Sequence, residues 1–175
     1  MRQGALAGSL MLLWATGVGA AETFVGNASA PQATRPAATP LTVTIREYTS
    51  DDRAFALAER LHKDGHPAAV AELAKGDAGT VTVGSGAPVR ATMVRQEKTA
   101  NGRMVRIVTE RPLQVTGDSP APPDTVGYVE LTLDASGKGT GRLLTAVKAT
   151  FDAEGFVVPE SLGETWAITD VKPGS

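Results

Sequence analysis

The stretch VRATMVRQEKTANGRMVRIVTE, residues 89–110, decides the fold class of this chain. It holds two runs in which apolar and polar residues alternate, on either side of Asn101-Gly102. Such alternation is typical of a β-strand with one buried face, and Asn-Gly between two such runs is the strongest short-range signal for a β-hairpin. The stretch therefore predicts two antiparallel strands joined by a tight turn, with Glu97 opposite Arg106 across the pair.

The same β-branched, alternating pattern continues on both sides of this hairpin. YVELTLD (128–134) and GRLLTAVKATFD (141–152) flank the turn sequence ASGKGT and predict a second hairpin. The other runs of this kind are ETFVGNA (22–28), LTVTIREY (41–48), TVTVG (80–84), GFVVPE (155–160) and WAITDVK (166–172). We count about eight strands in all, and we expect Trp166 to anchor the last of them in the core.

The period changes to that of a helix only between residues 49 and 75. A threonine and a serine, either of which can cap a helix, precede two aspartates that suit the first turn. Apolar residues then recur at helical spacing until Gly65, which is a natural helix end. Pro67 favours the first turn of a second, shorter helix.

The helices are grouped together and do not alternate with strands. This arrangement excludes a parallel sheet built from strand–helix–strand units and favours antiparallel pairing. The predicted fold class is α+β, mostly β. It is an antiparallel sheet or sandwich of about eight strands, with a two-helix hairpin packed on it.

The first 21 residues predict a secretory signal peptide. One charged residue, Arg2, precedes an uncharged and mostly apolar run at residues 5–18, and small residues follow at 19–21. The apolar run is shorter than the roughly 20 residues that a membrane span needs. We expect cleavage after Ala20 or Ala21 and export to the periplasm or the extracellular medium.

The remaining residues, 22–175, predict a single β-rich domain with a proline-rich loop or linker at residues 28–40. The chain has no cysteine, so we expect neither disulfides nor a lipid anchor at the cleavage site. No later segment is apolar enough for stable insertion in a membrane after cleavage. The domain must therefore be stabilised by an ordinary hydrophobic core.

The composition excludes several classes of partner. Without Arg2 the mature chain has 16 basic and 19 acidic residues, a net charge near −3, which predicts no attraction to nucleic acid. Aromatic residues make up only 5% of the chain, too few for a large stacking platform. We therefore expect an unknown ligand or a component of the cell envelope as the partner, and nothing in the sequence predicts a cofactor.

The hairpin region at 88–112 is also the most charged part of the chain, with a net charge of +4, and two interpretations of this charge stay open. Its arginines suit bidentate recognition of phosphate or carboxylate, which predicts an anion-binding surface. Charged side chains on a strand are also typical of a solvated face whose edge is protected from pairing with other chains. The candidate anion-binding residues are Arg90, Arg95, Arg103 and Arg106.

The two histidines, His62 and His66, lie four positions apart and are the candidate metal ligands. On one continuous helix they would share a face. Gly65 and Pro67 argue against one continuous helix through both histidines, and they favour a joint between two helices. A zinc site would also need at least one further ligand.

Two glycine-rich segments resemble catalytic motifs only in part. In SGKGTG (136–141) a glycine follows Lys138 where a phosphate-binding loop has serine or threonine, so a hairpin turn is favoured. VGSGAP, around Ser85, lacks the Gly-x-Ser-x-Gly pattern of a nucleophile elbow. The leading hypothesis is therefore an exported, non-enzymatic domain with a ligand-binding, partner-binding or envelope-associated structural role. The alternative is a metal-dependent or acid–base hydrolase that uses His62 and His66.

The order of the elements resembles a group of secreted bacterial proteins of unknown function. The segments that carry the resemblance are LTVTIREYTSDD, AELAKGDAGTVTVG, RIVTERPL, YVELTLDASGKGTGRLLTAVKATFD and ITDVK. The resemblance covers most of the mature chain and implies an exported single domain. It carries no site residues.

Overall fold

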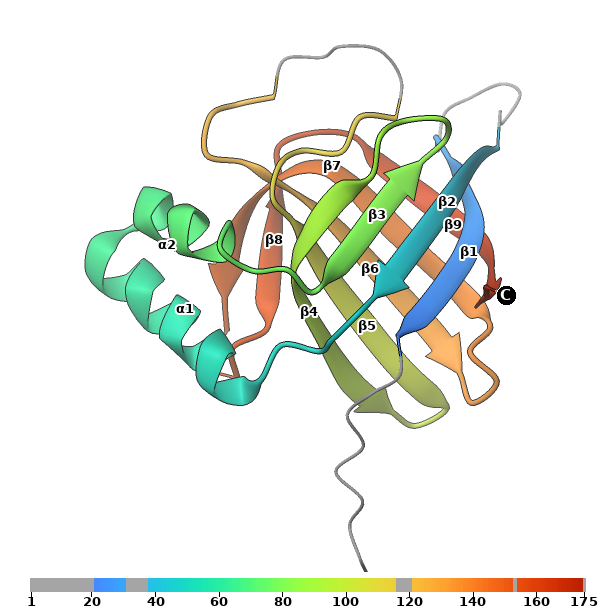
Figure 1. Cartoon of the computed structure of the whole chain (residues 1–175), viewed down its shortest axis with the longest axis horizontal. Coiled ribbons are helices and arrows are strands. Elements are labelled where there is room, and N and C mark those ends of the chain that lie inside the picture. The colour runs from blue at the N-terminus through green and yellow to red at the C-terminus, as the bar shows by residue number, and fades with distance from the viewer. Residues whose placement is uncertain (1–20, 31–37, 116–120, 153, 175) are drawn as a thin grey trace, which may run out of the picture.

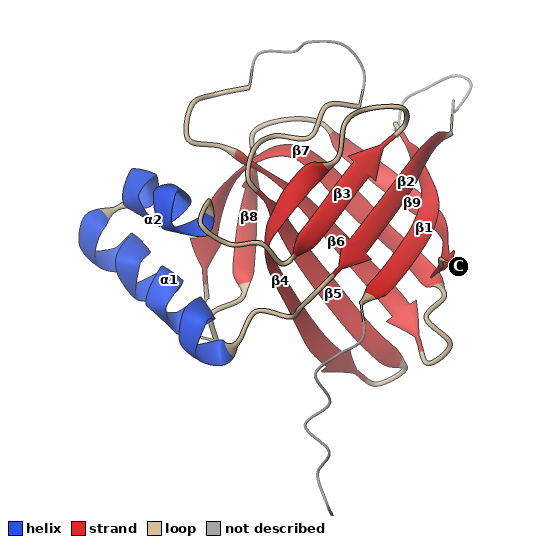
Figure 2. Cartoon of the chain, viewed as in Figure 1, coloured by secondary structure: helices blue, strands red, loops and turns tan. Residues whose placement is uncertain are grey.

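The computed structural model describes residues 21–30, 38–115, 121–152 and 154–174, and these ranges form two helices and nine strands (Figure 2). The elements are β1 (Glu22–Ser29), β2 (Thr39–Ile45), α1 (Asp51–Asp64), α2 (His66–Leu73), β3 (Gly79–Val83), β4 (Val89–Thr99), β5 (Gly102–Thr109), β6 (Val126–Asp134), β7 (Gly139–Phe151), β8 (Val157–Ser161) and β9 (Thr165–Pro173). Neither described helix has the length and apolarity needed to cross a membrane.

The strands close into a barrel (Figure 1). The hydrogen-bonded order is β6-β5-β4-β3-β2-β1-β9-β7, and β6 also pairs with β7, which closes a ring of eight antiparallel strands. The long strand β7 closes the ring because it pairs with β6 along one edge and, in its first half, with β9 along the other. The second half of β7 pairs with β8. β8 therefore lies outside the ring.

The mostly β composition, the antiparallel pairing and the helix pair are confirmed, but the predicted sheet or sandwich is a closed barrel. Closure depends on β1 pairing with β9, where Val25 lies opposite Lys172. These strands come from the two ends of the domain. Local alternation shows that each strand exists, but it carries no information about which distant strand becomes its neighbour.

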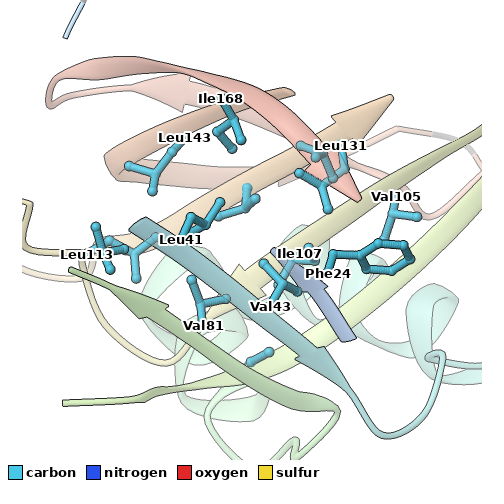
Figure 3. Close-up of a cluster of buried hydrophobic side chains, with 14 of the residues drawn as sticks. Phe24, Leu41, Val43, Val81, Val105, Ile107, Leu113, Leu131, Leu143 and Ile168 are labelled. Atoms are coloured by element: carbon cyan, nitrogen blue, oxygen red, sulfur yellow. The ribbon is translucent and has the colours of Figure 1, made fainter. Parts of the chain in front are cut away.

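Alternate side chains of the strands fill the barrel (Figure 3). On β5, Val105 and Ile107 are fully buried in this interior cluster, while Arg106 between them faces outward. Trp166 joins the same cluster from β9, as predicted. An eight-stranded barrel is just wide enough for side chains to fill its interior, and each buried valine, leucine or isoleucine contributes about 1.5–3 kcal/mol.

The two helices lie against the outside of the barrel (Figure 1). Ser50 caps α1 by accepting a hydrogen bond from the Arg53 N–H, and Gly65 ends it with a φ of 81°. The helices bury Ala54, Leu57 and Leu73 in a second apolar cluster. Its other members come from outward-facing positions of the sheet: Met93, Val108, Val126, Tyr128, Leu144, Val147, Ala149 and Val157.

Two local predictions need correction. In the β4–β5 hairpin Thr99 pairs with Gly102, so the turn consists of Ala100 and Asn101, and Arg106 lies opposite Arg95. The glycine is needed inside β5, because a Cβ there would collide with the carbonyl of Leu133. The loop predicted at residues 28–40 is shorter at both ends, because β1 continues to Ser29 and β2 begins at Thr39. Residues 31–37 lie outside the described residues.

Candidate functional site

Polar side chains gather at one end of the barrel interior, where β4 and β5 reach beyond the apolar cluster. Arg103 precedes Val105 by two residues, and Gln96 follows Val94 by two, so both share the inward face of their strands. Glu22 is related to Phe24 in the same way. We call this end the barrel mouth and define it by one set of residues: Glu22, Tyr48, Gln96, Lys98 and Arg103.

Arg103 is the centre of a hydrogen-bonded network in the mouth. Its Nη2 donates to Glu22 Oε2 at 2.5 Å, and its Nη1 donates to Glu22 Oε1 at 3.2 Å. The same Nη1 donates to Gln96 Oε1 at 3.0 Å and to the Tyr48 hydroxyl at 3.2 Å. Its guanidinium carbon lies 5.6 Å from the centre of the Phe24 ring, which caps the apolar interior. The charge of Arg103 is thus satisfied within the protein.

The network also changes the acidity of its members. Burial raises the pKa of Tyr48 to about 12, against the opposing effect of the Arg103 cation. The hydrogen bond from Arg103 to Glu22 is the main cause of the raised pKa of Arg103. Tyr48 therefore stays neutral over the physiological range and donates to Glu22 Oε2 at 3.2 Å.

Lys98 has no such partner among the residues that the structure describes. It lies directly opposite Arg103 in the β4–β5 pairing, an arrangement of like charges that is unfavourable. Glu22 compensates Arg103, and the ion pairs among the described residues leave Lys98 without a carboxylate within 4.0 Å. Its exposed ammonium is therefore free to meet an external group.

A cavity of about 550 Å³ lies at this end of the barrel, between the tips of the β4–β5 and β6–β7 hairpins. Its lining consists of Gln96, Glu97, Lys98, Thr99, Gly102, Arg103, Asp134, Ala135 and Gly137. Pockets for small molecules commonly have volumes of about 300–1,000 Å³, so the cavity has the size of a ligand site.

The β6–β7 turn holds a second charge of the lining in place. Asp134 Oδ1 accepts hydrogen bonds from the Ser136 hydroxyl at 2.7 Å, the Ser136 N–H at 2.8 Å and the Lys138 N–H at 3.0 Å. These bonds, above all that from the Ser136 hydroxyl, lower the pKa of the Asp134 carboxyl and keep it ionised. As predicted, the glycine-rich sequence here is a hairpin turn that leads into a strand.

The four arginines of the predicted anion-binding surface do not share one face. Arg103 points into the mouth, whereas Arg95 and Arg106 point outward. Arg90 donates to Glu110 Oε2 at 3.0 Å and to the carbonyl of Ala74, which follows α2. Each of the four has a carboxylate partner within 4.0 Å.

Arg95 and Arg106 stabilise the outer face of the barrel. Their guanidinium carbons lie 4.7 Å and 4.9 Å from the centre of the Phe156 ring. Arg95 also donates to Asp51 Oδ1 at 2.5 Å and to the carbonyl of Thr49, and only 9% of its side chain is exposed. Arg106 forms an ion pair with Glu97 at 3.2 Å, so the predicted pair exists, although the two residues are diagonal and not opposite.

A second hollow of about 400 Å³ lies beside Arg95 on this outer face. Its lining consists of Asp51, Phe55, Arg95, Gln96, Glu154 and Phe156. Phe55 is half-exposed here, and the terminal nitrogens of Arg95 donate to groups of the protein itself, while its buried Nε has no hydrogen-bond partner among the described residues. We regard this hollow as the packing boundary between α1 and the β7–β8 turn.

The two histidines lie on different helices. His62 is exposed in the last turn of α1, and His66 is the first residue of α2. Burial, aided by the Lys148 cation, lowers the pKa of His66. Within the described residues, no group of three or more histidine, cysteine, aspartate and glutamate side chains is placed to hold a metal ion.

Sequence reasoning missed most of the mouth. Lys98 was visible as part of the basic hairpin, and counting in steps of two from Val94 would have placed it on the inward face. Glu22 carried no comparable signal, because its partner Arg103 is 81 residues away in the chain.

Comparison of the chain with protein families, with curated proteins and with solved structures found no match.

Proposed function

We propose that this protein is an exported, non-enzymatic binding domain that takes a small molecule at the barrel mouth. The observation that carries the proposal is the cavity of about 550 Å³ between the two hairpin tips. Mouths of β-barrels are among the preferred places for ligand sites. The interior below is filled with side chains, so the ligand would lie on the mouth and not within the barrel.

The lining combines uncharged surface with a few charged groups, as sites for small molecules commonly do. Ala135, Gly102 and Gly137 offer surface without charge, and Lys98 and Asp134 offer one charge of each sign. The hydrogen-bonded network of Arg103 holds the floor of the mouth in a fixed arrangement. A rigid floor lowers the entropic cost of binding.

The proposed location outside the cytoplasm rests on the leader-like sequence at residues 1–21. The first strand begins at Glu22, directly after the expected cleavage site. Removal of the leader would therefore leave β1 intact and keep Glu22 beside Arg103 in the mouth. The partner is a small ligand in this proposal, with no role for nucleic acid or for insertion in a membrane.

Filling the cavity tests the proposal. We expect the purified protein to bind N-phenyl-1-naphthylamine, a neutral dye that fluoresces in apolar surroundings, at one saturable site. Ala135→Trp would place an indole in the cavity from the β6–β7 turn and should reduce the affinity for the dye at least about tenfold, which is about 1.4 kcal/mol. The measurement is a fluorescence titration, and thermal unfolding of each variant checks that it is folded.

The matched control is Ala100→Trp, because Ala100 is an exposed turn residue of the other hairpin and does not line the cavity. This variant should bind the dye like the original protein. Equal dye affinity in Ala135→Trp and Ala100→Trp would place the dye elsewhere and contradict the proposed site.

A further inference from the structure

The charged residues that line the cavity fall into two groups. Arg103 is neutralised by Glu22, and Glu97 is paired with Arg106. Lys98 and Asp134 remain, and neither forms an ion pair within 4.0 Å among the described residues. The cavity therefore has one cation and one anion that form no ion pair among the described residues, supplied by different hairpins, and the Lys138 cation of the same turn also acts on Asp134.

We propose that the ligand of the mouth is a small zwitterion with an apolar body, such as an amino acid with an aliphatic side chain. This inference rests on the proposed function. The ligand's carboxylate would meet Lys98, and its ammonium would meet Asp134. Its apolar body would lie against Ala135 and the backbone of Gly102, which also line the cavity.

The two charges are suited to this role for different reasons. Lys98 is a point charge on a flexible stem that can reach a carboxylate in several positions. Lys98 lies directly opposite Arg103, whose charge is already compensated by Glu22, so the Lys98 ammonium is the cation of the lining that can meet a ligand carboxylate. Asp134 is held in a fixed position by hydrogen bonds to one oxygen, Oδ1.

A ligand with only one charge would be recognised less well. A simple carboxylate would be attracted by Lys98 and repelled by Asp134. A simple amine would be attracted by Asp134 and repelled by Lys98. Both charges are exposed and are screened by salt. Exposed ion pairs are weak, so each charge is expected to change the affinity by up to about fivefold.

Three compounds with the same branched carbon chain separate the contributions. Leucine is a zwitterion, 4-methylpentanoate lacks its ammonium, and 3-methylbutylamine lacks its carboxylate. We expect leucine to bind the full chain about two- to fivefold more tightly than either analogue at low ionic strength. Ligand-observed NMR titration gives the three dissociation constants directly, without a competing dye.

Two variants remove one charge each. Lys98→Met should abolish the advantage of leucine over 3-methylbutylamine, which has no carboxylate. Asp134→Asn keeps an oxygen that can accept the turn hydrogen bonds, and it should abolish the advantage of leucine over 4-methylpentanoate. Lys148→Met is the matched control, because Lys148 is an exposed lysine in the second half of β7 that does not line the cavity, and it should leave all three affinities unchanged.

The inference is overturned if leucine binds no better than its analogues, or if its advantage survives in both Lys98→Met and Asp134→Asn. It is also overturned if leucine does not bind. If leucine shows no preference but Ala135→Trp still weakens binding of the dye, the mouth is a binding site with another specificity. If leucine shows no preference and Ala135→Trp does not weaken binding of the dye, the proposed function is wrong as well.

Discussion

At the scale of single residues, the same type of side chain has different roles according to which face of a strand it occupies. Arg103 and Arg106 are three positions apart on β5. Arg103 pairs with Glu22 at the end of the barrel interior, whereas Arg106 stacks on Phe156 outside the barrel. The alternation in the sequence predicts this division. It does not predict Glu22 or Phe156 as partners, because both come from distant parts of the chain.

The buried guanidinium of Arg95 should contribute strongly to stability. Arg95→Ala removes hydrogen bonds to Asp51 and to the carbonyl of Thr49, which would be left without this donor. We expect a loss of about 2 kcal/mol in the free energy of unfolding, since hydrogen bonds to charged groups contribute about 1.5–3 kcal/mol. Chemical denaturation of the variant measures this loss.

Arg46→Ala is the control for that measurement, because Arg46 forms an ion pair with Asp77 while about half of its side chain is exposed, 47%. Its loss should cost less than about 1 kcal/mol. Equal destabilisation by the two substitutions would show that the burial of Arg95 does not matter to stability.

At the scale of elements, most of the helices and strands could be predicted, because each has a local signal. The end of α1 at Gly65 and the start of α2 around Pro67 follow directly from the backbone preferences of those two residues. The turn of the β4–β5 hairpin was placed one residue late. Gly102 is required by the neighbouring strand β6 and not by the turn, and a single hairpin cannot reveal that requirement.

The packing of the helix pair on the barrel makes Leu57 a sensitive position. Leu57 is 1% exposed in the second apolar cluster. Leu57→Ala should lower the free energy of unfolding by about 3 kcal/mol, from lost apolar burial and the cavity that remains. Phe55→Ala, on the same helix but at a half-exposed side chain, should cost under about 0.5 kcal/mol. Denaturant unfolding that ranks the two variants in the opposite order would contradict this packing.

At the scale of the whole molecule, closure into a barrel creates the candidate site, and closure is what the sequence did not predict. The mouth joins Glu22 from β1, Tyr48 from the segment before α1, and Gln96, Lys98 and Arg103 from the β4–β5 hairpin. Only pairing between distant strands brings these residues together. The candidate site was therefore less predictable than the elements that build it.

We propose that small molecules bind at the barrel mouth and not at the outer face. The most direct measurement is an amide-resolved NMR titration of the ¹⁵N-labelled protein with 1-naphthol, a soluble neutral aromatic compound. We predict saturable shifts concentrated at residues 96–103 and 134–137, the two hairpin tips that line the cavity. Shifts centred instead on Phe55 and Phe156, beside the outer hollow, would show that the ligand binds the outer face and not the mouth.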